Sequence, residues 1–199
     1  NGMPGSMEGM IVYNRYNRLG TVEKNTEMGI YGTIEEIDAL FEEQIPVQVA
    51  EKEEIHTGDA TIRCCLGEEV REYGIQITEV DPNAKEENKG IVLEVMDPEL
   101  MDETGGIIQG MSGSPILQDG KLIGAVTHVF VNDPTKGYGI FAETMLETVC
   151  DGQEVDKICG KTDKNWKESI YKIMHFYTDQ RRADEKRKRP FFFEIVESI

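Results

Sequence analysis

Basic residues are scarce in this chain: 21 Lys and Arg stand against 38 Asp and Glu, which gives a formal net charge of −17. The imbalance lies in the first 150 residues, because residues 151–199 contain 11 basic and 10 acidic side chains. Cationic side chains supply most of the affinity of a protein for nucleic acid and for anionic lipid surfaces. The charge therefore argues against both of these partners, and it suits a basic substrate as well as plain solubility.

Cysteine and long apolar runs are also in short supply. The four cysteines are Cys64, Cys65, Cys150 and Cys159, with no Cys-x-x-Cys pair and no zinc-like histidine spacing. We therefore expect neither a metal nor a cofactor, whereas a Cys150–Cys159 disulfide stays open. No apolar run approaches the roughly 18 residues of a membrane-spanning helix, and no signal peptide is evident. The sequence thus shows no anchor of its own and leaves the compartment of this chain unassigned.

The chain does contain a distinctive motif, Gly-Met-Ser-Gly-Ser-Pro, at residues 110–115. The pattern Gly-x-Ser-Gly-x-Pro is typical of the segment that presents the nucleophile in a trypsin-like serine protease. Ser112 would attack the substrate, and the backbone N–H groups of Gly110 and Ser112 would stabilise the oxyanion. Gly113 permits a sharp bend, and Pro115 leads into the next strand. The alternative interpretation is a glycine-rich hairpin whose serines are incidental.

The sequence on both sides of the motif resembles one family. Residues 103–146, together with residues 18–34 and 89–106, are similar to the SpoIVB-type sporulation serine peptidases (peptidase family S55) of endospore-forming bacteria. The resemblance is strong in these blocks and loose between about residues 35 and 88. It implies a trypsin-like (chymotrypsin-like) β-barrel protease domain. It also implies that Ser112 is the nucleophile and that Asp97, in an Asp-Pro dipeptide, orients the catalytic histidine.

The catalytic histidine that the resemblance implies would lie in a Gly-His motif well upstream, and this sequence contains no such motif. A serine without a general base keeps a hydroxyl that is almost never ionised at neutral pH. Loss of one triad member leaves about 10³- to 10⁴-fold catalysis over water. The PDZ domain and membrane anchor of the family are also missing, so we expect the C-terminal portion of a longer peptidase. For Asp97, capping a short helix is the alternative role.

The three histidines that this chain does contain bear on the question of a base. His128 lies on the strand that follows the nucleophile, where it would be buried, line the substrate pocket or serve as an alternative base. His56 lies among carboxylates, which raise the pKa of its imidazole and favour a surface role. His175 lies in a segment with helical periodicity near the C-terminus.

Short β-like segments separated by turn residues recur along the first 150 residues. Their spacing predicts an all-β barrel or sandwich. A trypsin-like protease has two barrels, so under that interpretation this chain would be an incomplete pair. The segments are residues 9–13, 29–34, 44–50, 59–65, 73–80, 90–95, 115–118, 121–131 and 137–141. We therefore predict a peptidase domain over residues 1–150. Helical periodicity after Asp163 predicts a helical, charged extension of unknown role over residues 151–199.

These observations predict a serine endopeptidase of the sporulation signalling type. The resemblance implies that it cleaves itself and a regulatory protein of a membrane-embedded protease, in the space between forespore and mother cell. The alternative is a catalytically inactive, truncated peptidase domain that binds peptides or proteins, with the missing N-terminal segment as one partner.

Overall fold

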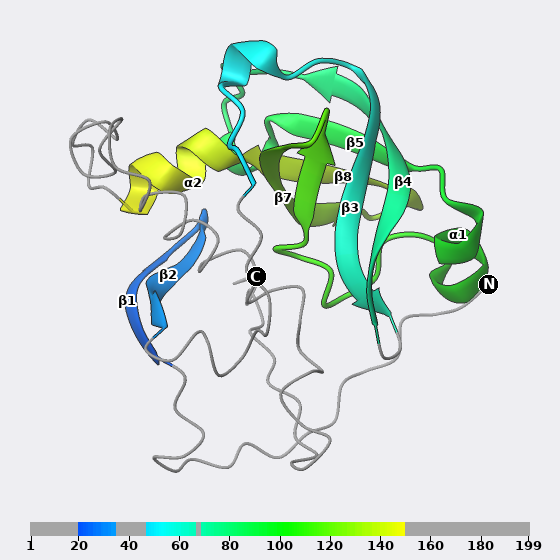
Figure 1. The fold of residues 1–199 in the computed structure, drawn as a ribbon, viewed down its shortest axis with the longest axis horizontal. Coiled ribbons are helices and arrows are strands. Elements are labelled where there is room, and N and C mark those ends of the chain that lie inside the picture. The colour runs from blue at the N-terminus through cyan, green and yellow to red at the C-terminus, as the bar shows by residue number, and fades with distance from the viewer. Residues whose placement is uncertain (1–19, 35–46, 67–68, 150–199) are drawn as a thin grey trace.

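The computed structural model describes residues 20–34, 47–66 and 69–149 (Figure 1). These residues form a closed barrel of antiparallel strands and a separate two-stranded sheet. The predicted mainly β, barrel-containing fold class is therefore confirmed. Residues 151–199, with the predicted helical extension, lie outside the described residues, as does the segment 9–13. Within the described segments, no helix has the length and apolar character that crossing a membrane requires.

The barrel strands follow the order β3-β4-β5-β8-β7-β6, and each neighbouring pair is antiparallel. They are β3 (Gly58–Leu66), β4 (Glu69–Val80), β5 (Ile91–Val95), β6 (Pro115–Gln118), β7 (Lys121–Phe130) and β8 (Asp133–Phe141). The barrel closes between β3 and β6 through two residue pairs, Thr61 with Leu117 and Ile62 with Ile116. β6 begins at Pro115, which has no backbone N–H to donate to a ladder.

Apolar side chains that alternate along the strands fill the barrel. In β5, Ile91, Leu93 and Val95 are buried, while Val92 and Glu94 between them are partly exposed. This period of two is what a strand with one face toward a core produces. The largest fully buried side chains come from different strands and meet inside the barrel: Tyr73, Ile62, Ile77, Ile91, Leu93, Ile116 and Ile123. Their burial supplies the main stabilisation of the scaffold that carries the motif.

The turn between β6 and β7 forms at Asp119-Gly120, a dipeptide typical of tight hairpin turns. Asp119 and Gly120 have φ angles of 53° and 75°. Two positive φ angles in a two-residue loop characterise the type I′ hairpin turn, whose twist matches that of the flanking strands. Aspartate tolerates this left-handed conformation better than most residues with a Cβ.

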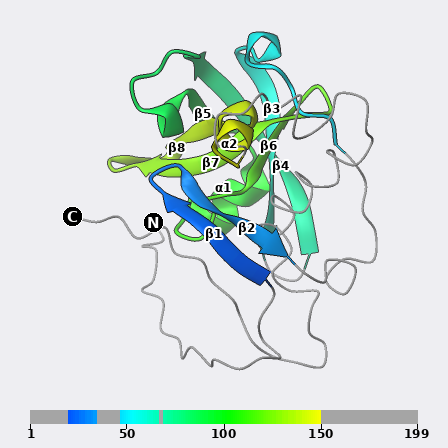
Figure 2. The ribbon, with the colours of Figure 1, turned by 90° about the vertical axis from the view of Figure 1, so that its left-hand side faces the viewer.

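A smaller apolar cluster lies outside the barrel. β1 (Gly20–Thr26) and β2 (Gly29–Ile34) form an antiparallel hairpin, and α2 (Ala142–Val149) follows β8. Figures 1 and 2 both place this hairpin beside α2, and Lys24 Nζ donates a hydrogen bond to the carbonyl of Thr148 at 2.6 Å. The cluster consists of Leu122, Ala125, Ile140, Ala142 and Leu146, with Met28, Val47, Val49 and Met145 packed against it.

Predicted and observed strands agree best at β2 and β6, whose bounds are those expected. β4 and β8 begin four residues earlier than predicted, at Glu69 and Asp133, because their backbones stay paired as far as Leu66 of β3 and Phe130 of β7. The prediction of a strand over residues 44–50 was wrong for its described part, in which Val49 forms an isolated bridge to Leu122. β1 and α2 were not predicted, because β1 contains a single apolar side chain, that of Val22, and α2 is short.

The two cysteines of β3 face opposite sides of the strand, as adjacent residues of a strand do. Cys64 is buried and Cys65 is partly exposed. Burial raises the pKa of the Cys64 thiol to about 12. The thiol therefore stays protonated and acts as a small apolar core group.

Candidate active site

Ser112 lies in two consecutive turns that join α1 (Pro98–Thr104) to β6. The first turn is closed by a hydrogen bond from Met111 N–H to the carbonyl of Ile108 at 3.1 Å, and the second by one from Ser114 N–H to the carbonyl of Met111 at 3.0 Å. The third residue of each turn is a glycine with positive φ, 100° at Gly110 and 88° at Gly113. This is the glycine position of a type II turn. The glycines of the motif therefore set the path of the backbone around Ser112.

The motif is attached to β7 by a pair of backbone hydrogen bonds. Gly113 N–H donates to the carbonyl of Val126 at 2.7 Å, and Val126 N–H donates to the carbonyl of Ser114 at 2.9 Å. Met111 is 3% exposed and packs in the main core. The turn is thus anchored to β7 and to the main core, while Gly110 is exposed and Ser112 is partly exposed.

Two backbone N–H groups of the motif differ from their neighbours. Met111, Gly113 and Ser114 each donate a backbone hydrogen bond, whereas the N–H groups of Gly110 and Ser112 donate none within the described part of the chain. These are the two donors that the sequence predicts for the oxyanion hole. Donors held by a rigid backbone and left without an internal acceptor can stabilise a developing negative charge at little reorganisation cost.

The side chain of Ser112 has one hydrogen bond within the described residues. Its Oγ–H donates to the carbonyl of Thr127, in β7, at 2.8 Å. A peptide carbonyl is not a proton acceptor at neutral pH in the way that an imidazole is, so this contact holds the hydroxyl without activating it. The sequence did not indicate this partner, since Thr127 lies within an uninterrupted strand-like run.

Thr127 and His128 lie in a β-bulge of β7. Val126 pairs with Gly139 and Val129 pairs with Gly137, so two residues of β7 lie opposite the single residue Tyr138 of β8. Bulges interrupt a ladder and redirect side chains, and they are common beside active sites. The ladder interruption falls at the residue whose carbonyl accepts from Ser112.

His128 lies one residue beyond the Ser112 contact, and its ring is partly buried. No hydrogen bond joins it to Ser112 in the described chain. The pKa of Glu86 is lowered first by the hydrogen bond and charge of Lys89, and to a lesser degree by the neighbouring His128. A role for His128 as pocket residue or alternative base stays a prediction.

Asp97 is the N-cap of α1. Its Oδ1 accepts from the N–H groups of Glu99 at 2.9 Å and Leu100 at 3.1 Å, and its Oδ2 accepts from Gly74 N–H at 3.1 Å. Desolvation raises the pKa of Asp97, but these three donors together outweigh it and hold the pKa below its ordinary value. The alternative capping role is therefore present in the structure. No hydrogen bond connects Asp97 with Ser112, and the orienting role of Asp97 stays a prediction.

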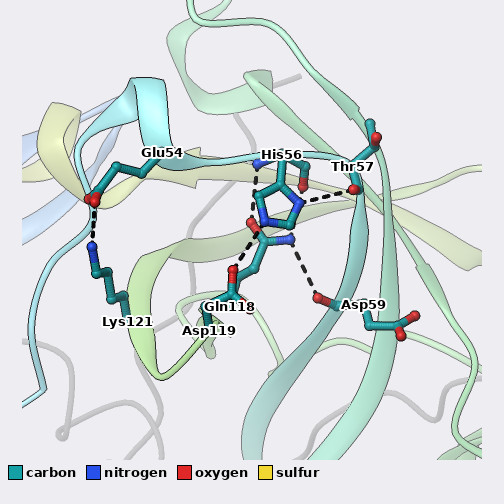
Figure 3. A network of polar contacts seen from close by, with 7 residues as sticks. All are labelled: Glu54, His56, Thr57, Asp59, Gln118, Asp119 and Lys121. Atoms are coloured by element: carbon teal, nitrogen blue, oxygen red, sulfur yellow. Dashed lines mark hydrogen bonds and ion pairs between the residues drawn. The ribbon is translucent and has the colours of Figure 1, made fainter.

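His56 lies at the other end of β6 from Ser112. Its Nε2 is 3.0 Å from Asp119 Oδ2 and its Nδ1 is 3.0 Å from the carbonyl oxygen of Thr57 (Figure 3). Both ring nitrogens face acceptors, so the protonated ring is favoured; the Thr57 carbonyl and then Asp119 raise the pKa of His56. β6 separates it from Ser112 by about 10 Å of strand. The predicted surface role of His56 is confirmed, and His175 lies outside the described residues.

A groove of about 500 Å³ lies on the barrel surface across β4, β5 and β8. Its lining includes Lys89, Lys136 and the rings of Phe130 and Tyr138, whose centroids are 4.6 Å apart. No residue of the Ser112 motif lines this groove. Over the described segments, no group of three or more His, Cys, Asp and Glu side chains is placed to hold a metal ion.

A β-barrel that displays a serine on glycine turns, beside two unused N–H donors, has the architecture of a serine peptidase. The chain belongs to the SpoIVB peptidase S55 family, whose family model matches residues 1–146. The resemblance predicted from residues 103–146 is therefore confirmed, and the family is one of serine peptidases.

The solved structures that are similar to this chain include two of the Rv3671c protease from M. tuberculosis. The active form is 15% identical with a TM-score of 0.47, and the likeness covers 66% of this chain and 56% of that chain. The inactive form, a serine-to-alanine mutant, is 17% identical with a TM-score of 0.38, covering 53% of this chain and 52% of that chain. The match thus spans little more than half of those proteins. No curated protein matches this chain.

Proposed function

We propose that this chain is a serine endopeptidase of the sporulation signalling type, with Ser112 as nucleophile. The observation that carries the proposal is the double turn around Ser112, which combines a partly exposed serine with the unused N–H groups of Gly110 and Ser112. Family membership adds support, because the match includes the whole motif. By family resemblance, the substrates are the chain itself and a regulatory protein of a membrane-embedded protease. The net charge of −17 suits a basic segment in such a substrate.

In the proposed reaction, Ser112 Oγ bonds to the carbonyl carbon of the scissile peptide as its proton passes to a general base. The carbonyl oxygen becomes an oxyanion and accepts hydrogen bonds from the N–H groups of Gly110 and Ser112. The base then returns the proton to the leaving amine as the C–N bond breaks. A water molecule, activated by the same base, releases the acyl group from Ser112.

The base in this proposal is a histidine that Asp97 orients. His128 is the candidate nearest in the described chain, and the family resemblance favours a histidine upstream of this sequence. In either case the O–H bond of Ser112 has to turn from the carbonyl of Thr127, to which it donates at 2.8 Å, toward the base, while Oγ keeps its position. The proton then has an imidazole nitrogen as its acceptor.

The proposal is tested by labelling the folded chain with a fluorophosphonate, which reacts with an activated serine. Ser112→Ala should abolish labelling. Ser114→Ala is the matched control, because Ser114 belongs to the same motif but is 2% exposed and holds β7 through its backbone carbonyl. Labelling that survives Ser112→Ala would reject Ser112 as the nucleophile.

One observation favours the alternative, a peptidase domain that binds peptides without cleaving them. The hydroxyl of Ser112 donates to a backbone carbonyl and not to a base. If the folded wild-type chain is never labelled, either alone or within a longer chain that includes the upstream region, the alternative replaces the peptidase proposal. Labelling in the longer chain alone would assign the base to the upstream region.

A further inference from the structure

Three hydrogen bonds connect the nucleophile to a distant part of the chain. Ser112 Oγ donates to the carbonyl of Thr127 at 2.8 Å, and Thr127 Oγ1 donates to the carbonyl of Asn88 at 2.7 Å. Asn88 Nδ2 in turn donates to the carbonyl of Glu27, in the turn between β1 and β2, at 3.4 Å. Asn88 belongs to η3 (Glu87–Lys89), in the connection from β4 to β5. Four segments of the chain therefore meet in one line of contacts that begins at Ser112.

The position of Thr127 makes its side-chain bond more important than an ordinary surface contact. The bulge interrupts the β7–β8 ladder at Thr127 and His128, so the ladder does not hold this part of the backbone in place. The bond from Thr127 Oγ1 to Asn88 supplies a fixed point within the interruption. Since a carbonyl cannot move independently of its own residue, this bond also sets where the Thr127 carbonyl meets Ser112 Oγ.

The connection at Asn88 is itself held from both sides. Lys89 N–H donates to the carbonyl of Glu86 at 2.9 Å, and Asp81 N–H donates to the carbonyl of Gly90 at 2.8 Å. A Cβ at Gly90 would collide with the ring of Phe141, so this backbone lies directly against the barrel. The carbonyl of Asn88 is thus a rigidly held acceptor for Thr127 Oγ1.

We propose that Thr127 is a positioning residue for Ser112: its hydroxyl, anchored on the backbone of Asn88, fixes the bulge of β7 and so places the nucleophile. This inference rests on the proposed peptidase function for its kinetic consequence, but its structural part stands without catalysis. Thr127 touches no reacting atom of the substrate in this role and acts through Ser112.

The kinetic test compares rates of fluorophosphonate labelling at Ser112. Thr127→Val keeps the shape of the side chain and removes the donor, and Thr127→Ser keeps the donor. We expect Thr127→Val to slow labelling about fivefold or more and Thr127→Ser to stay within about twofold of wild type. The matched control is Thr78→Val, because Thr78 lies in the bulge of β4 and donates from Oγ1 to the carbonyl of Val92 at 3.3 Å. It should label at the wild-type rate.

A second readout does not need catalysis. In a double-mutant cycle of thermal unfolding, the decreases in Tm caused by Ser112→Ala and Thr127→Val should not add, because removing one bond weakens the other. The decreases caused by Ser112→Ala and Thr78→Val should add. If Thr127→Val does not fold, Thr127→Ala takes its place in both experiments.

The outcomes separate the two proposals. If the wild-type chain is not labelled but the double-mutant cycle is non-additive, the result rejects catalytic activity of this chain and supports the positioning role of Thr127. Additive decreases in Tm, or a Thr127→Val variant that labels at the wild-type rate, overturn the positioning role. Equal slowing by Thr127→Val and Thr127→Ser would also overturn it, since the hydroxyl would then not be the group responsible.

Discussion

At the scale of single residues, the glycines of the motif determine what Ser112 can do. Gly110 and Gly113 hold positive φ angles that a residue with a Cβ adopts only with strain. The resulting turns direct the N–H groups of Gly110 and Ser112 away from internal acceptors. A conformational preference of two residues thus becomes a potential binding site for negative charge.

We predict that Gly110→Ala lowers both stability and labelling at Ser112. The new Cβ meets no atom within 4 Å, so the cost arises from φ alone, and we expect about 1 kcal/mol of unfolding free energy. Gly105→Ala is the control, because Gly105 also has positive φ, 73°, and open space, but ends α1. Denaturant unfolding should show similar losses for both variants. Only Gly110→Ala should reduce the labelling rate, and equal labelling of the two would refute the role of Gly110.

Asp97 has two separable roles, capping and the predicted orientation of a histidine. Asp97→Asn keeps an oxygen for the N–H groups of Glu99 and Leu100 but can turn an amide N–H toward the N–H of Gly74. Because the folded pKa of Asp97 is lowered, its carboxylate contributes stability above its unfolded pKa of about 3.9. That contribution is lost as the pH falls through the depressed folded pKa.

We therefore expect the Tm of Asp97→Asn to lie below that of wild type at neutral pH and to approach it in acid. Thermal unfolding at several pH values measures this difference. The orienting role is judged separately by labelling at neutral pH, with Asp133→Asn as the control, since Asp133 also has a lowered pKa but lies at the start of β8. Unchanged labelling in a folded Asp97→Asn chain would leave capping as its sole function.

At the scale of elements, the segment that leads into β3 is fastened to the β6–β7 turn (Figure 3). Gln118 is 3% exposed; its Oε1 accepts from His56 N–H at 3.1 Å, and its Nε2 donates to the carbonyl of His56 at 2.9 Å. Glu54 and Lys121 form an ion pair beside it. These contacts fix the far end of β6, the strand that begins at the last residue of the Ser112 motif.

The His56–Asp119 pair gives this attachment a pH dependence. The folded pKa of His56 is raised, so its contribution to stability is fully present below the unfolded pKa of about 6.5 and is lost as the pH rises through the folded value. We predict that Asp119→Asn, which keeps a residue suited to the type I′ turn, lowers the Tm at pH 5.5 more than at pH 9. Thermal unfolding at both pH values measures this, and equal decreases would show that the ion pair contributes nothing.

At the scale of the whole molecule, stability depends on closing the barrel. β3 and β6 meet through two residue pairs, and one of them joins the fully buried Ile62 and Ile116. Every other barrel seam is longer. The Ser112 motif leads directly into β6, so this short seam supports the candidate site as well as the fold.

We predict that Ile62→Ala destabilises the chain by about 2–5 kcal/mol, the usual cost of a large core truncation. Val22→Ala is the control, since Val22 is 50% exposed on the separate hairpin and should cost less than about 0.5 kcal/mol. Denaturant unfolding measures both values. A loss below 1 kcal/mol at Ile62 would mean that the seam does not limit the stability of the barrel.

The sequence by itself determined the features that depend on neighbours within a few residues. The alternation in β5, the Asp119-Gly120 turn, the bounds of β2 and β6, and the motif around Ser112 are all local consequences of side-chain chemistry. They were predictable because a positive φ or a period of two requires no distant partner. The family could be predicted for the same reason, since its signature lies in short continuous segments, residues 18–34, 89–106 and 103–146.

Only the tertiary structure decided which distant groups meet. The contact of Ser112 with Thr127, the bulge at Thr127 and His128, the pairing of His56 with Asp119 and the hydrogen bond from Gly74 to Asp97 each join separate segments of the chain. Their geometry depends on strand register, and register is set by the summed packing of many buried side chains. No single residue determines the register, so these contacts form only when the barrel is closed.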